Sequence, residues 1–162
     1  MGAYFVRVMK QEIAYPYRKN ADRTVFEFVS VGPKGRVVKL IEFTALVAGA
    51  DPTEDVYNLA LGDRGADGLL DDQPVTNNGD TQPVLLTVAA AVVEFTQRHP
   101  QARLLATGGT PARTRLYQMG IARNLPEIQA DFVIEGLTAA GWEDFQVGIP
   151  YHAFLIRRRF TQ

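Results

Sequence analysis

Two glycine-containing turns that precede helices are the places in this sequence where a ligand could be bound. The first is Gly108-Gly109-Thr110-Pro111, which is followed by Arg113 and Arg115. Thr110 is placed to cap a helix beginning at Pro111, and the glycine pair lets the chain turn with its N–H groups exposed. A helix start combines free donors with the positive end of the helix dipole, so this turn is predicted to bind a phosphate or carboxylate.

A second turn, Asn77-Asn78-Gly79-Asp80, leads into another predicted helix, with Asp80 or Thr81 as its N-cap. When two parallel strands are joined by a helix, the helices that follow the two strands begin at the same edge of the sheet, and ligands bind at this edge. We therefore expect the two turns to face one crevice. The predicted ligand-binding residues are Asn77, Asn78, Gly79, Thr81, Gly108, Gly109, Thr110, Arg113 and Arg115.

The same residues also fit a structural interpretation without a ligand, in which they form a capped helix whose arginines pair with an acidic segment. Residues 51–80 hold eight acids against one arginine, whereas residues 95–126 hold five arginines and no acid. Arg113 and Arg115 point about 200° apart around a helix, so one can bind while the other supports. The glycine pair lacks the lysine and spacing of a P-loop and the three-glycine dinucleotide motif.

Other kinds of catalytic site are poorly supported. There is no cysteine, Ser30 is the only serine, and the two histidines, His99 and His152, are 53 positions apart and are expected at the surface or a strand edge. A serine triad and a histidine metal site are therefore disfavoured. Asp63, Asp67, Asp71 and Asp72 do not have EF-hand spacing and are interpreted as a solvated loop.

The composition indicates a single domain over residues 1–162 with a substantial core, because 46% of the residues are hydrophobic. The absence of cysteine favours a cytoplasmic location, and no signal peptide or membrane span is expected in the first 15 residues. The net charge of −1 disfavours nucleic acid as a partner. The arginines at 157–159 are interpreted as protection of an edge strand against aggregation.

Hydrophobic periodicity places the two turns in an α/β (α+β) fold. Segments 22–31 and 36–44 predict a hairpin around Gly32-Pro33-Lys34-Gly35, and 55–61 predicts a third strand. A long loop, a helix over 83–98, a strand over 102–107 parallel to the third, and a helix over 111–123 follow. Strands around 132–136 and 151–160 complete a mixed, largely antiparallel sheet with two main helices.

Three blocks, VGPKGRVVKLIEF, NNGDTQPVLLTVAAAVVEF and GGTPARTRLYQMGI, resemble a family of small bacterial proteins whose domain has no assigned function. The element order and Arg113-Thr114-Arg115-Leu116-Tyr117 are also similar to the GNAT acetyltransferase superfamily. That similarity implies acyl-coenzyme A as a cofactor and Tyr117 as the acid that protonates the departing thiolate. The superfamily's Gln/Arg-x-x-Gly-x-Gly/Ala pyrophosphate turn is absent.

The sequence thus supports two functional hypotheses. The first is a GNAT-like domain that binds an anionic ligand, an acyl or nucleotide cofactor or phosphate, between the two turns. The second is a non-enzymatic component of a bacterial two-gene, toxin-antitoxin-like system, in which the oppositely charged segments recognise another protein. The ligand, the cofactor and the oligomeric state are not specified by the residues.

Overall fold

The computed structural model of the chain describes residues 13–46, 55–71 and 77–160. The chain forms two compact units. Unit 1 contains residues 1–43 and 60–98, and unit 2 contains residues 44–59 and 99–162. Strand β4, Val56–Arg64, runs from unit 2 into unit 1. The single domain predicted over 1–162 stays a prediction.

Unit 1 is built on an antiparallel hairpin. Strands β2 (Val25–Gly32) and β3 (Gly35–Ala45) pair in the register Val25↔Glu42 to Gly32↔Gly35, so Pro33 and Lys34 form a two-residue turn. The short strand β1 (Tyr17–Lys19) pairs with the outer edge of β2. On the other side β4 follows β3, and its end pairs with β5 (Leu70–Asp71). The predicted hairpin is confirmed.

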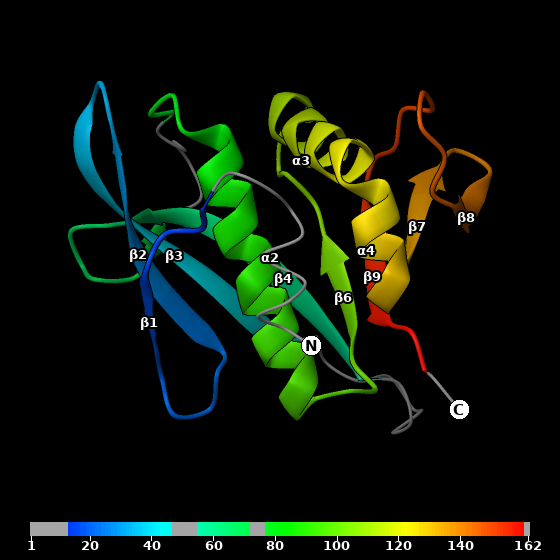
Figure 1. The fold of residues 1–162 in the computed structure, drawn as a ribbon, viewed down its shortest axis with the longest axis horizontal. Coiled ribbons are helices and arrows are strands. Elements are labelled where there is room, and N and C mark those ends of the chain that lie inside the picture. The colour runs from blue at the N-terminus through cyan, green and yellow to red at the C-terminus, as the bar shows by residue number, and fades with distance from the viewer. Residues whose placement is uncertain (1–12, 47–54, 72–76, 161–162) are drawn as a thin grey trace. The chain divides into compact units, whose positions relative to one another are not determined.

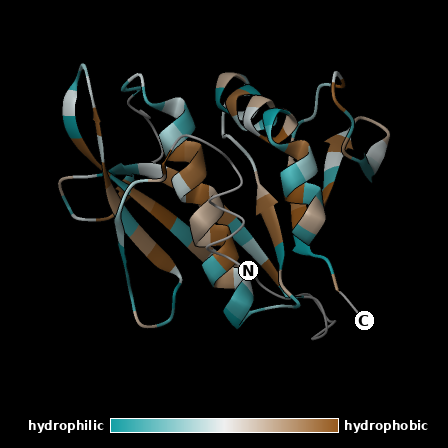
Figure 2. Cartoon of the chain, viewed as in Figure 1, coloured by the Kyte–Doolittle hydropathy of each residue, from teal (hydrophilic) through white to brown (hydrophobic). Residues whose placement is uncertain are grey.

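Helix α2 (Thr81–Arg98) covers one face of these strands (Figure 1). Its apolar side chains meet those of the hairpin, and the rings of Phe43 and Phe95 stack with their centroids 4.2 Å apart. Phe26 packs edge-on against Phe43, so aromatic rings fill the centre of this unit. Figure 2 shows the corresponding run of hydrophobic residues along α2 and the strands behind it. The helix begins two residues earlier than predicted.

A polar stripe along α2, made of Thr87, Glu94 and Arg98, also contacts other parts of unit 1. The backbone N–H of Tyr15 donates to Thr87 Oγ1 at 2.9 Å, and Thr87 is fully buried. Further along the helix, Glu94 accepts hydrogen bonds from the Tyr17 hydroxyl and the Lys19 ammonium group. Residues 15–19 therefore lie along α2, where each polar group of the stripe has a partner.

Unit 2 contains a mixed sheet with the strand order β4-β6-β9-β7-β8. Strand β6 (Arg103–Ala106) runs parallel to β4, as predicted from the helix between them, and all other pairs here are antiparallel. The remaining strands are β9 (Phe154–Arg158), β7 (Phe132–Thr138) and β8 (Gly141–Asp144). Helices α3 (Pro111–Arg123) and α4 (Leu125–Asp131) precede β7.

The α+β class with a mixed, mostly antiparallel set of strands is confirmed, with several corrections to the elements. The predicted loop over 62–80 is wrong at its start, because β4 continues to Arg64 and β5 returns to it, while residues 72–76 lie outside the described residues. The segment after Asn124 forms α4 before β7, so the described residues contain three helices. Strands β1 and β8 were not predicted. Strand β9 lies between β6 and β7, so Arg157 cannot protect a sheet edge.

Candidate functional site

The turn between β6 and α3 is held in place by a close approach of backbone to backbone. A Cβ atom on Gly108 would lie 2.1 Å from the Thr114 amide nitrogen, so only glycine fits there. The Gly108 N–H donates to Thr114 Oγ1 at 3.0 Å, and the same hydroxyl donates to the Thr110 carbonyl at 3.0 Å. The turn is thus fixed against the first residues of α3.

Gly109 and Thr110 complete the helix start as the sequence predicts. Gly109 has φ +76°, in the left-handed region that favours glycine. Thr110 is the N-cap, and its side-chain oxygen accepts a hydrogen bond from the Arg113 N–H at 3.2 Å. Among the described residues, the N–H groups of Gly109, Thr110 and Ala112 make no hydrogen bond. Three backbone donors are therefore available beside the positive end of the helix dipole.

A hollow of about 770 Å³ lies at this helix start, entirely within unit 2. Arg115 and His152 contribute nitrogen donors to its wall, which also contains the Tyr151 phenol and includes no Asp or Glu. The described part of the chain gives the Arg115 guanidinium no hydrogen bond or ion pair. The full lining is Thr107, Gly109, Thr110, Pro111, Thr114, Arg115, Gln118, Met119, Gly148, Pro150, Tyr151 and His152.

The far wall of the hollow is a loop that follows β8, and two side chains hold it. Gln118 on α3 accepts from the Tyr151 N–H at 3.1 Å and donates to the Ile149 carbonyl. The buried Tyr151 hydroxyl donates to Glu143 at 2.8 Å and accepts from the Gln146 N–H at 3.0 Å. Burial, and then the Glu143 hydrogen bond, raise the pKa of Tyr151. These bonds place His152 at the hollow, a position that the sequence did not indicate.

Not every residue predicted at this turn lines the hollow. Gly108 is buried against α3, and Arg113 is half-buried and lies outside the lining, whereas Arg115 lies within it. Of the two arginines, Arg115 belongs to the lining, while the Arg113 guanidinium lies close to Gly109 at the same turn. Tyr117 is also outside the lining; burial raises its pKa to about 12, and nearby Arg113 lowers it in part. Its hydroxyl is protonated at neutral pH, and its catalytic role stays a prediction.

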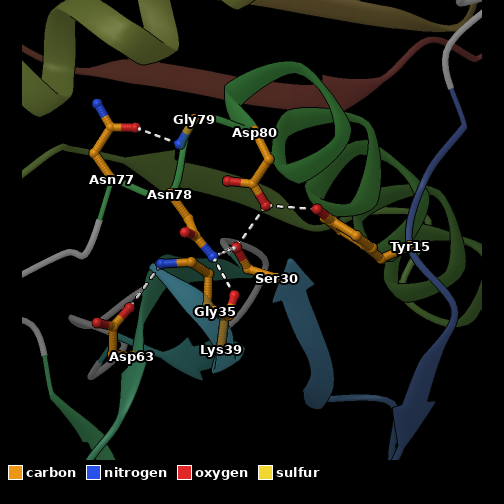
Figure 3. Close-up of polar contacts among 9 residues, drawn as sticks. All are labelled: Tyr15, Ser30, Gly35, Lys39, Asp63, Asn77, Asn78, Gly79 and Asp80. Carbon is orange, nitrogen blue, oxygen red and sulfur yellow. Dashed lines mark hydrogen bonds and ion pairs between the residues drawn. The ribbon is translucent and has the colours of Figure 1, made fainter. Parts of the chain in front are cut away.

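The second turn, residues 77–80, makes hydrogen bonds to other segments of unit 1 (Figure 3). The Asn78 side chain is fully buried, and its Oδ1 accepts from the Lys34 N–H at 2.7 Å. Its Nδ2 donates to the Gly35 carbonyl at 2.9 Å and to Ser30 Oγ at 3.2 Å. Asn78 therefore fastens the β2–β3 turn to the start of α2, and its amide is occupied by protein groups.

The neighbours of Asn78 are also bonded within unit 1. The exposed Asn77 accepts from the Gly79 N–H at 3.1 Å. The Asp80 carboxylate accepts from the Tyr15 hydroxyl at 2.6 Å and from the Ser30 hydroxyl (Figure 3). Burial, and then the Asp80 hydrogen bond, raise the pKa of Tyr15. The predicted shared crevice would join residues of both units, and it stays a prediction.

A buried ion pair lies close to this network and was missed by the sequence interpretation. Lys39 on β3 is 2% exposed, and its Nζ lies 2.7 Å from Asp63 Oδ1 on β4 (Figure 3). Asp63 is therefore part of a strand and not of a solvated loop. The strand alternation carried a signal, because Val37, Lys39, Ile41 and Phe43 share one face of β3.

Comparison with known proteins gives a family but no activity. Residues 11–159 match the model of a family of unknown function, DUF6934. The chain belongs to that family. No curated protein matches the chain. No solved structure matches it either, so the resemblance to the GNAT superfamily stays a prediction. In the described residues, no helix is long and apolar enough to cross a membrane.

Proposed function

We propose that this DUF6934 protein binds a small anionic molecule in the hollow at the start of α3. The observation that carries the proposal is the convergence of the Arg115 guanidinium, the His152 imidazole and the free N–H groups of Gly109 and Thr110 on one hollow without a carboxylate. All of these groups donate hydrogen bonds, and the helix dipole adds positive potential.

The size and the walls of the hollow favour an anion with an attached body over a bare inorganic ion. A volume of about 770 Å³ is in the range of small-molecule sites, which is roughly 300–1,000 Å³. Threonine hydroxyls at 107, 110 and 114 lie near the helix start, while Pro111, Met119 and Pro150 add apolar wall. An acyl or nucleotide cofactor, with a phosphate at the helix start and its body on the apolar wall, fits this distribution.

Thermal-shift titration tests the proposal with inorganic phosphate, nucleotides and acetyl-coenzyme A as separate probes. A ligand at ten times its Kd stabilises the folded state by about 1.4 kcal/mol. For a chain of this size, that corresponds to a rise in Tm of roughly 3–6 °C. We expect such a rise with at least one of these probes, and we expect Arg115→Ala to abolish it.

Arg123→Ala is the matched control, because it removes the same charge from the opposite end of the same helix, outside the hollow. It should keep the ligand-dependent shift measured from its own ligand-free Tm. Equal loss in both variants would mean that the long-range field of α3, and not the hollow, attracts the anion. No shift with any probe at 10 mM would refute the proposal and favour the protein-binding, toxin-antitoxin-like alternative.

A further inference from the structure

One face of the unit 2 sheet carries an unusual arrangement of charge. Strand register places Phe132, Ile134 and Gly136 of β7 on one face together with Phe154 and Leu104, and all five residues are buried. Tyr151, which is bonded to α3, packs against Gly136 on this face. The opposite face carries Leu105, Val133, Leu137, Trp142 and Leu155, which are half-buried or, for Trp142, 42% exposed.

On this second face, two register pairs each bring two side chains of the same charge opposite each other. Arg103 on β6 is the register partner of Arg157 on β9, and Glu135 on β7 is the partner of Asp144 on β8. Like charges directly opposite in an antiparallel pair destabilise a sheet. Within the described ranges, none of these four side chains makes an ion pair or hydrogen bond that would offset the repulsion.

We propose that this face, made of Leu105, Val133, Leu137, Trp142 and Leu155 with Arg103, Arg157, Glu135 and Asp144, is the interface of a homodimer. In this dimer two copies stack face to face about a two-fold axis that lies in the plane between their sheets, halfway between the basic and the acidic pair. The axis brings the basic pair of each copy onto the acidic pair of the other copy. The same operation stacks the apolar residues between them. A second copy of the chain thus places opposite charges directly over both pairs at once.

The dimensions of the sheet are compatible with this arrangement. The two pairs are separated by two strand spacings of about 4.8 Å and by two residues of about 3.4 Å along the strands, or roughly 12 Å in total. Stacked sheets lie about 10 Å apart, a gap that arginine and glutamate side chains from both copies can bridge. The residues of this face lie on four strands, so the interface is small, and we expect a dissociation constant of micromolar order.

Charge exchange between two positions tests the proposal in the full chain. Sedimentation velocity of the wild type at 5–200 µM should show a concentration-dependent dimer. Arg157→Glu and Glu135→Arg each place like charges across the two-fold axis, and each should weaken self-association at least tenfold. An equimolar mixture of the two variants restores opposite charges at both contacts, so it should form a heterodimer. The double variant should dimerise again by itself.

Lys34→Glu is the matched control, because it makes the same change in net charge as Arg157→Glu on an exposed turn of unit 1. It should leave the dissociation constant within about twofold of the wild type. A wild-type chain that stays monomeric at 200 µM would overturn the proposal. Dimers that persist in both single variants, or a mixture that shows no heterodimer, would also overturn it. Far-UV circular dichroism of each variant confirms that a lost dimer is not a lost fold.

Discussion

Substitution of Asn78 by alanine tests whether this residue is a structural fastener of unit 1. The change removes the acceptor for the Lys34 N–H and the donor for the Gly35 carbonyl and Ser30 Oγ. It also leaves a cavity, because the Asn78 side chain is fully buried. We therefore expect Asn78→Ala to destabilise unit 1 by loosening the β2–β3 turn from the start of α2.

The magnitude follows from the groups left without partners. A buried donor or acceptor without a partner costs about 1–3 kcal/mol, and Asn78→Ala orphans two backbone groups. The Lys34 and Gly35 positions themselves are exposed, so water can replace part of the loss. We therefore expect a fall in the free energy of unfolding of roughly 2–4 kcal/mol. In a chain of this size, such a loss lowers Tm by about 4–16 °C.

Urea unfolding followed by circular dichroism measures this free energy, and Asn77→Ala provides the control. Asn77 is the same residue type one position earlier, is exposed, and within the described residues accepts one hydrogen bond, from the Gly79 N–H. Its replacement should cost about 0.5–1 kcal/mol. A loss below 1 kcal/mol for Asn78→Ala, or equal losses in the two variants, would refute the structural role. It would also favour the prediction that this turn binds a ligand.

Three further predictions concern other contacts. Lys39→Met leaves the mostly buried Asp63 carboxylate without its ammonium partner and should cost about 2–4 kcal/mol in urea unfolding, while adding Asp63→Leu should recover at least half of the loss. Gly108→Ala should lower Tm far more than Gly109→Ala, because the new Cβ meets backbone at 2.1 Å in the first case and only strained φ in the second. Burial acts to raise the pKa of Glu94, but hydrogen bonds from Lys19 and Tyr17 bring this pKa below the usual 4.5. The contribution of the Glu94 carboxylate to folding stability is therefore complete above pH 4.5 and is lost as the pH falls through the lower pKa of the folded state. Glu94→Gln should therefore destabilise by about 0.5–1 kcal/mol at pH 7 and by progressively less below pH 4.5, measured by urea unfolding at each pH.

The sequence alone determined the local elements, because their signals lie within a few residues of each other. The turn Pro33-Lys34 is flanked by runs of β-branched residues, and Thr110-Pro111 combines an N-cap with a proline at the first helical position. Capping and turn chemistry act on neighbouring backbone groups, so these features were predicted at nearly the residues where they occur. The parallel pairing of β4 with β6 was also predicted from the sequence, because a helix between two strands favours a crossover connection.

Only the tertiary structure decided which partners the polar side chains contact. Asn78 was predicted to contact a ligand, but its partners lie 43 to 48 residues away in the chain, at the turn that it fastens. Arg157 was predicted at a sheet edge, yet β9 inserts between β6 and β7, and register then places the arginine opposite Arg103. His152 reaches the hollow through a loop held by Gln118. Such contacts depend on strand order and register, which local propensity does not encode, because a shift by one residue turns every side chain of a strand to the other face.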